Sequence, residues 1–201
     1  MWNGKRDFIH VLLYGKPGTA KSDLALTTAK INPISKVAVG THITGVGLTA
    51  SVEKDELTGH YLAKGGMLSR CNEGLAVIDE IEKMNDNDKK SLHMPMESGF
   101  FGLEKAGISA KVLTKTSILS TSNPKVSSNG QKVLALNLEN CDLPAPIIDR
   151  FDFIVTFRDY PDDRKDEMIA SFLVERATFD ENDNSFLQNQ DTFSKNNNTF
   201  Y

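Results

Sequence analysis

The strongest chemical pattern in the sequence is the run GKPGTAKS at residues 15–22. An apolar run at residues 8–14 precedes it and a helix-like segment at residues 23–30 follows, which predicts a strand, a tight loop and a helix. Glycines let backbone amides approach a phosphate, and the helix N-terminus adds partial positive charge. Lys21 can reach the β- and γ-phosphates, and the Ser22 hydroxyl can ligate Mg²⁺. The run therefore predicts a site for a nucleoside triphosphate.

One position departs from the usual phosphate-loop pattern. Ala20 stands immediately before the lysine, where the pattern places a second glycine. The alternative interpretation is a helix-capping loop without a ligand. The strand, loop and helix order favours the phosphate loop.

Two acids, Asp79 and Glu80, follow the short apolar run at residues 75–78. Such a run is typical of a strand buried on both faces, and open α/β sheets bind ligands at the carboxyl ends of their strands. Asp79 suits a Mg²⁺ ligand, directly or through water, and Glu80 suits polarising the water that attacks the γ-phosphate. A solvated strand end is the alternative, which the upstream phosphate loop disfavours.

The composition limits the classes of protein. The chain has 201 residues, enough for one substantial core, and its net charge of −4 argues against coating nucleic acid through bulk positive charge. Cys71 and Cys141 lack metal-ligand spacing, so we expect reduced, structural thiols. No apolar segment approaches the roughly 20 residues that span a bilayer, so we expect a soluble, intracellular protein without a membrane partner.

Strands and helices alternate along the chain, which predicts an α/β sheet. Five strands are expected, at residues 8–14, 35–39, 75–78, 116–121 and 153–157. Helices are expected at residues 23–30, 83–97 and 162–177, with Pro95 kinking or ending the second one. Two hairpins are expected, at residues 48–64 and 100–113, the latter with its turn at residues 106–107.

The last stretch, residues 178–201, differs in kind because phenylalanine recurs every seven residues among Asn, Asp, Gln and Lys. One apolar residue per heptad cannot bury enough surface to offset ordering, so we expect a disordered, Asn-rich tail. A phenylalanine-based docking motif is the alternative.

Taken together, these residues resemble the AAA+ motor domain of the MCM replicative helicase family, over roughly residues 5–177. The matching strings are the Walker A variant with Ala20, the helix-2 insert at residues 46–50, the Walker B block at 78–84, the pre-sensor-1 hairpin at 104–108, the sensor-1 strand at 116–124 and the arginine-finger segment at 149–152. The resemblance implies an AAA+ P-loop NTPase core at residues 1–177, with a parallel five-stranded sheet flanked by helices and two β-hairpin insertions.

The same resemblance implies roles for individual residues. Asn123 would hold the attacking water or the γ-phosphate, and Arg150 would complete the neighbouring subunit's site in a ring. Lys105 would contact DNA phosphates from a hairpin tip, assisted by Lys111. The residues implied to bind ATP and Mg²⁺ are Gly15, Pro17, Gly18, Thr19, Ala20, Lys21, Ser22 and Asp79, with Ser22 and Asp79 at the metal and Glu80 as the catalytic carboxylate.

Arg150 and the two hairpin lysines could also have structural roles only. Arg150 could form a surface ion pair with Asp149 or Asp152, and the lysines could solvate an exposed hairpin. The sequence also departs from the family pattern at Lys16, at Asp149 and at Pro95. It contains neither the family's helical lid with its sensor-2 arginine nor its N-terminal collar, so we expect a fragment or a reduced relative.

The resemblance implies an ATP-dependent DNA helicase motor core that hydrolyses ATP at subunit interfaces and translocates on single-stranded DNA in replication. It implies a homo- or hetero-hexameric ring acting on chromosomal DNA, in the nucleus of a eukaryote or the cytoplasm of an archaeon. A non-hydrolysing, nucleotide-binding subunit or assembly module is one alternative, and another AAA+ remodelling ATPase is a second.

Overall fold

The computed structural model describes residues 7–57, 59–105, 107–125, 138–158, 167–172 and 174. The chain forms two units, residues 1–158 and 159–201. The strands of the first unit are β1 His10–Gly15, β2 Ser35–Val39, β3 Ala50–Lys54, β4 Tyr61–Gly65, β5 Leu75–Asp79, β6 Phe100–Lys105, β7 Ile108–Leu113, β8 Ser117–Ser122 and β9 Phe153–Phe157. Its helices are α1 Lys21–Ile31, α2 Gly45–Leu48, α3 Met67–Arg70, η1 Ile81–Lys83, α4 Asp86–Lys90, α5 His93–Ser98, η2 Leu138–Asn140 and α6 Ala145–Ile148.

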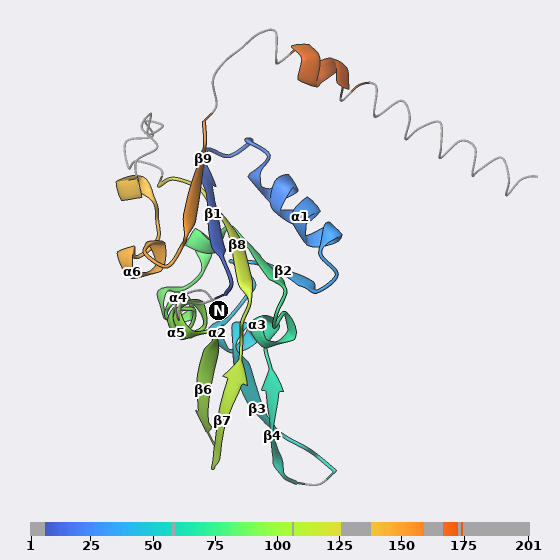
Figure 1. Ribbon diagram of the computed structural model, residues 1–201, viewed down its shortest axis with the longest axis vertical. Coiled ribbons are helices and arrows are strands. Elements are labelled where there is room, and N and C mark those ends of the chain that lie inside the picture. The colour runs from blue at the N-terminus through green and yellow to red at the C-terminus, as the bar shows by residue number, and fades with distance from the viewer. Residues whose placement is uncertain are drawn as a thin grey trace, which may run out of the picture. The chain divides into compact units, whose positions relative to one another are not determined.

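A five-stranded sheet in the order β2-β5-β8-β1-β9 forms the centre of the first unit (Figure 1). All four strand pairs are parallel. The register places Leu12 of β1 beside Ser120 of β8 and Ile154 of β9. Because parallel strands align their carboxyl ends, the loops after β1, β5 and β8 meet at one edge. The predicted parallel α/β sheet is confirmed.

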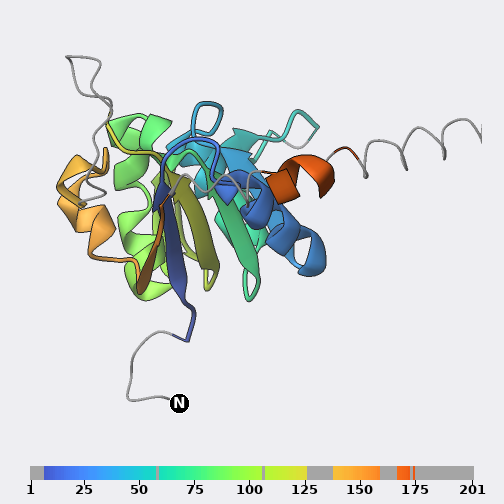
Figure 2. The same cartoon turned by 90° about the horizontal axis from the view of Figure 1, so that it is seen from above.

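Helices cover both faces of this sheet, as Figure 2 shows. Alternate residues of β1 face opposite sides: Leu12 and Tyr14 join the larger core cluster, whereas Leu13 joins the cluster beneath α1. The buried apolar side chains of α1 are the small Ala25 and Ala29, which let the helix approach the strands closely. This packing holds the start of α1 against the carboxyl edge of the sheet.

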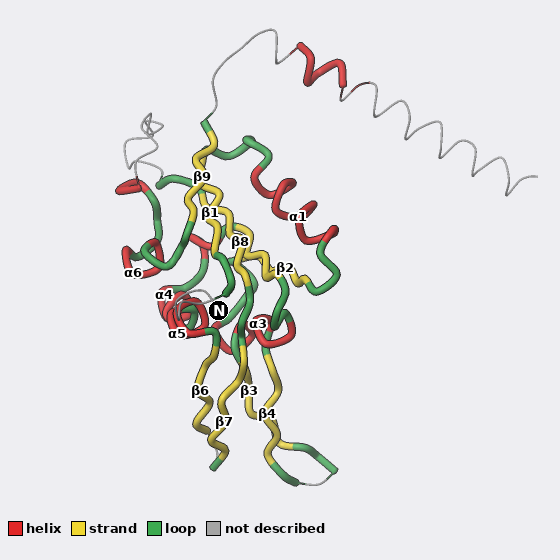
Figure 3. The backbone as a smooth tube through the Cα atoms, viewed as in Figure 1, coloured by secondary structure: helices red, strands yellow, loops and turns green. Residues whose placement is uncertain are grey.

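Two antiparallel hairpins extend in the same direction from this unit (Figure 3), which confirms the two predicted insertions. The first pairs β3 with β4, and the second pairs β6 with β7. In the second, the last pair is Lys105 with Ile108, which places the end of the hairpin between these two residues. Gly107 has φ +78°, the left-handed conformation that such tight turns require. Residue 106 lies outside the described residues.

The predicted single helix over residues 83–97, kinked or ended at Pro95, is wrong. Three short helices, η1, α4 and α5, occupy this region, and the chain turns at residues 91–92 rather than at the proline. Pro95 is the third residue of α5, within the first turn, where backbone N–H groups have no partner inside the helix. The proline is therefore compatible with α5, which ends at Ser98 and is followed by the cap residue Gly99 with φ +68°.

The predicted helix over residues 162–177 falls partly outside the described residues. Residues 167–172 and 174 are helical, and Met168 and Phe172 are exposed. The predicted tail at residues 178–201 lies outside the described residues altogether. Among the parts of the chain that the structure describes, no helix is long and apolar enough to cross a membrane.

Candidate nucleotide-binding site

The loop between β1 and α1 makes a close backbone approach and adopts left-handed conformations, both at small residues. A Cβ atom at Gly15 would lie 2.4 Å from the carbonyl oxygen of Phe157 in β9, so β1 can end this close to its neighbour only at glycine. Gly18 has φ +82°, and Ala20, the residue before α1, has φ +58°. The left-handed conformation at Ala20 is strained for an L-residue, and glycine would adopt it freely.

The Lys21 ammonium group lies inside this loop. Its Nζ donates to the Lys16 carbonyl at 2.6 Å and to the Thr19 hydroxyl at 3.2 Å. Burial lowers the pKa of Lys21, and the nearby carboxylates of Glu82 and Asp79 oppose this shift. The loop thus holds a partly desolvated positive charge at the N-terminus of α1, an arrangement suited to binding a phosphate anion.

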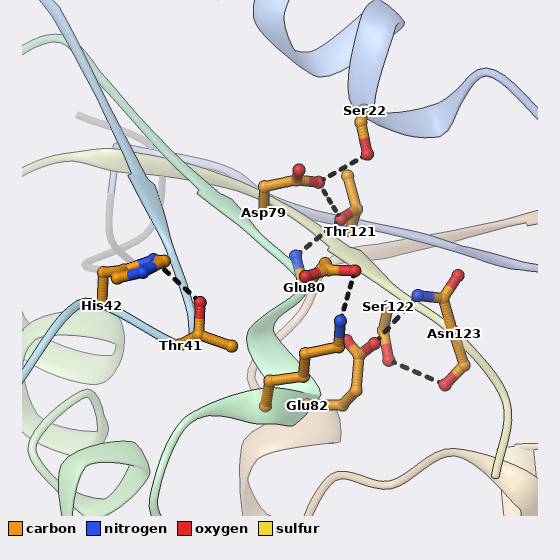
Figure 4. Close-up of polar contacts among 10 residues, drawn as sticks. Ser22, Thr41, His42, Asp79, Glu80, Glu82, Thr121, Ser122 and Asn123 are labelled. Carbon is orange, nitrogen blue, oxygen red and sulfur yellow. Dashed lines mark hydrogen bonds and ion pairs between the residues drawn. The ribbon is translucent and has the colours of Figure 1, made fainter. Parts of the chain in front are cut away.

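Asp79 accepts hydrogen bonds from two other elements (Figure 4). Its Oδ1 accepts from Ser22 of α1 at 2.8 Å and from Thr121 of β8 at 2.5 Å. A serine hydroxyl beside a carboxylate is an oxygen donor set that fits Mg²⁺. The two residues predicted as metal ligands are therefore in direct contact.

Thr121 was not predicted from the sequence. Its hydroxyl donates to Asp79 and accepts from the backbone N–H of Glu80 at 2.9 Å. It therefore fixes both acids at the end of β5. Only the pairing of β5 with β8 reveals this contact, because Thr121 is 42 residues from Asp79 in the chain.

Glu80 and Asn123 lie beside the phosphate loop. They line a cleft of about 270 Å³ together with Pro17, Gly18, Thr19, Ala20, Lys21, Ser22 and Asp23. Glu80 has φ +53°, and its Oε1 accepts from Lys83 Nζ at 2.7 Å. The structure thus brings Glu80 and Asn123 to the loop.

Glu82 is a second residue that the sequence interpretation missed. Its Oε1 accepts a hydrogen bond from Asn123 Nδ2 at 3.0 Å. Its Oε2 is buried and has no hydrogen-bond partner among the described residues. Burial raises the pKa of this carboxyl group. The sequence signal was an acid two residues after Glu80, at a position where only the fold shows that the side chain turns inward.

Arg150 lies at the other end of the strands from the phosphate loop. It precedes the amino end of β9, whereas the loop follows the carboxyl end of the parallel strand β1. Its guanidinium forms an ion pair with Glu97 of α5 at 2.9 Å and donates to the carbonyls of His93 and Pro146. The structure thus does not bring Arg150 into the cleft of its own chain.

The two lysines predicted to contact DNA lie on the second hairpin. Lys105 is the last residue of β6, and it pairs with Ile108 at the end of the hairpin. Lys111 is exposed on β7, with its Nζ 3.8 Å from the centroid of the Phe100 ring. This distance is typical of a cation–π contact. The Lys111 ammonium group therefore lies over Phe100, the first residue of β6, at the end of the hairpin opposite Lys105.

The parallel sheet, the glycine-rich loop between β1 and α1, and the acids after β5 define a P-loop nucleotide-binding core. The family model of the MCM P-loop domain matches residues 3–177, and the chain belongs to this family.

Curated relatives come from eukaryotes and archaea. DNA replication licensing factor mcm2 of Schizosaccharomyces pombe is 37% identical over 175 residues, which cover 86% of this chain and 21% of the relative. The minichromosome maintenance protein MCM of Saccharolobus solfataricus is 35% identical over 171 residues, which cover 85% of this chain and 24% of the relative. The chain therefore spans less than a quarter of the length of these two relatives.

Proposed function

We propose that this chain is an ATP-dependent DNA helicase motor core of the MCM type, which hydrolyses ATP at subunit interfaces and translocates on single-stranded DNA in replication. The observation that carries the proposal is the gathering of Lys21, Glu80 and Asn123 around one cleft, beside the Ser22 and Asp79 pair. Membership in the MCM P-loop family supports it. The motor core is assigned to residues 1–177 and the site of action to chromosomal DNA.

The chain's own residues divide the work of hydrolysis. Backbone N–H groups of the loop residues 15–20, except Pro17, which has none, and the Lys21 ammonium bind the β- and γ-phosphates of ATP. When bound, Mg²⁺ neutralises charge on the phosphate oxygens, and the Ser22 hydroxyl and the Asp79 carboxylate would hold it. Glu80 polarises the attacking water, and Asn123 holds either that water or the γ-phosphate.

Arg150 acts on the site of a neighbouring subunit. The five residues of β9 span about 16 Å, so Arg150 is too far from the phosphate loop of its own chain to reach it. A cation is needed against the charge that develops on the transferred phosphoryl group. Supplying it from the next subunit requires a ring of MCM-type subunits, which we assign as a homo- or hetero-hexamer.

The second hairpin contacts DNA. Lys105 at its tip binds the phosphate backbone without reading sequence, and Lys111 assists from the adjacent strand. One lysine per subunit binds weakly, but a ring repeats it around a central channel. The hairpin at residues 100–113 carries Lys105 and Lys111 against the single acid Glu104, so it is locally positive although the whole chain has a net charge of −4.

Two substitutions test the proposal. Lys21→Ala removes the phosphate-binding charge and is expected to abolish ATP binding, whereas Glu80→Gln should retain binding and lose turnover by roughly 10²-fold or more. ATP binding and steady-state hydrolysis are measured with single-stranded DNA present. The matched control is Glu73→Gln, which removes an exposed carboxylate at the opposite end of β5. Substantial turnover in Glu80→Gln would refute the catalytic assignment.

A second candidate function is a nucleotide-binding subunit that does not hydrolyse ATP. The observation in its favour is that Lys83 Nζ lies 2.7 Å from Glu80 Oε1, so this ion pair competes with water for the Glu80 carboxylate. Binding of ATP and Mg²⁺ without turnover by the wild-type chain, even at high protein concentration with DNA, would favour this alternative.

A further inference from the structure

The side-chain amide of Asn123 has a defined orientation. Its Nδ2 donates to Glu82 Oε1 at 3.0 Å. A carboxylate oxygen can only accept, so this contact requires the NH₂ group, and not the carbonyl oxygen, to face Glu82. Figure 4 shows the amide oxygen of Asn123 pointing away from Glu82. Since Asn123 also lines the cleft, the end of the amide that remains for a ligand is the hydrogen-bond acceptor.

The burial of Glu82 costs free energy that a purely structural role does not explain. It lies in η1, its Oε2 is buried without a partner among the described residues, and burial disfavours its charged form. A buried carboxylate with an unsatisfied oxygen costs more than a neutral group of the same shape. A glutamine would fill the same space, but its amide could equally present a donor and would not fix the orientation of Asn123.

We propose that Glu82 is a positioning residue that holds the Asn123 amide with its NH₂ group toward η1 and its carbonyl oxygen toward the cleft, where that oxygen accepts a hydrogen bond from the attacking water. This inference rests on the proposed function, which left open whether Asn123 meets water or the γ-phosphate. An acceptor facing the cleft repels phosphate oxygens and binds water. Asn123 and Glu80 then contact the same water, each through an oxygen atom.

The nucleotide-free 201-residue chain tests the orientation by NMR. The side-chain NH₂ signals of Asn123 are assigned by their loss in Asn123→Asp. We expect these signals to shift as Glu82 titrates above the usual pH range of a glutamate, and the shift to vanish in Glu82→Gln while the backbone spectrum is retained. Glu82→Asp keeps a titrating carboxyl group and should keep a pH-dependent shift. Signals that are the same in wild type and Glu82→Gln would overturn the inference.

A reciprocal exchange tests the acceptor role. Glu82→Gln and Asn123→Asp should each lower kcat by roughly 10²-fold with little change in KM, because the attacking water loses its position. In the double variant, the amide introduced at position 82 donates to one oxygen of the carboxylate introduced at position 123, and the other oxygen of that carboxylate still faces the cleft. We expect at least a tenfold gain in kcat over Asn123→Asp alone, roughly 1.4 kcal/mol of recovered transition-state stabilisation. Glu73→Gln is again the matched control.

The outcomes separate the two proposals. A double variant no faster than Asn123→Asp would mean that the reaction needs the NH₂ group at the γ-phosphate, and the acceptor role would be wrong. Absence of turnover in the wild-type chain would refute the proposed function instead. The NMR titration needs no hydrolysis, so it tests the Glu82 and Asn123 contact in either case.

Discussion

Lys21 is a single residue whose positive charge suits phosphate binding but whose burial disfavours that charge. Its ammonium group is buried in the loop, and burial lowers its pKa despite the carboxylates of Glu82 and Asp79. A lowered pKa means that the protonated side chain is less favourable in the folded chain than in the unfolded chain. The charge that would bind phosphate therefore destabilises the nucleotide-free fold.

Lys21→Met should raise the unfolding free energy of the nucleotide-free chain at neutral pH. The Lys16 carbonyl keeps one partner, because the Thr19 hydroxyl donates to it at 2.8 Å. The unfolded chain binds more protons in the window between the lowered pKa of Lys21 and its usual value, so wild-type stability should rise with pH through this window and the advantage of the variant should shrink. Urea unfolding at several alkaline pH values measures this. A variant less stable than wild type at neutral pH would contradict it.

Residue types and spacing were sufficient to predict the loop residues and both acids at the end of β5. They were insufficient for Thr121 and Glu82. Both contacts depend on β5 lying beside β8, and sequence separations of 42 and 41 residues hide that neighbourhood. The hydrophobic periodicity of a strand predicts which face of the sheet a residue occupies. It does not predict which residue of the neighbouring strand lies beside it.

At the scale of elements, the contact between β1 and β9 limits the loop. Gly15 ends β1, and its backbone approaches the carbonyl oxygen of Phe157 so closely that a Cβ atom would lie 2.4 Å from that oxygen. The neighbouring atom is backbone and cannot move without displacing β9. The position of the phosphate loop therefore depends on a glycine whose φ is not itself unusual.

Gly15→Ala should destabilise the chain by about 1–3 kcal/mol through this overlap. Gly102→Ala is the matched control, since a Cβ at Gly102 meets nothing within 4 Å, and its effect should stay within about 0.5 kcal/mol. Urea midpoints of the two variants give the comparison. Equal midpoints would show that the two strands can separate without cost.

The elements themselves were predictable to different degrees. The five strands and two hairpins follow from short apolar runs and turn residues. The predicted helix over residues 83–97 placed its interruption at Pro95, because helix propensity counts proline as a helix breaker at any position. In the structure Pro95 lies in the first turn of α5, where a proline is tolerated. Where that first turn begins is determined by the burial of Leu92 and Met96 in the core, which the local sequence does not specify.

At the scale of the whole molecule, the place of Arg150 is best explained by assembly. It lies beyond the reach of its own cleft, and Glu97 holds it at 2.9 Å near the surface of the same unit. Under the proposed function, a subunit has a complete nucleotide site only where a second subunit meets it. Activity should therefore depend steeply on protein concentration.

Mixing two inactive variants tests this arrangement. Arg150→Ala retains Glu80, and Glu80→Gln retains Arg150, so an interface that takes its loop from the first chain and its arginine from the second is intact. In an equimolar mixed ring, about one quarter of the interfaces have this composition. ATP hydrolysis by the mixture should approach that fraction of wild type. Activity no higher than the sum of the two separate variants would exclude the shared site.

The connection between the second hairpin and the central sheet has a mechanical consequence. β7 leads into β8 through residues 114–116, and Thr114 and Thr116 are buried there, with the Thr116 hydroxyl donating to the carbonyls of Leu68 and Cys71. The same strand, β8, carries Thr121 and is followed by Asn123. A force applied at the hairpin tip is thus transmitted to the cleft through the continuous backbone of β7 and β8. It does not depend on non-covalent contacts between separate elements.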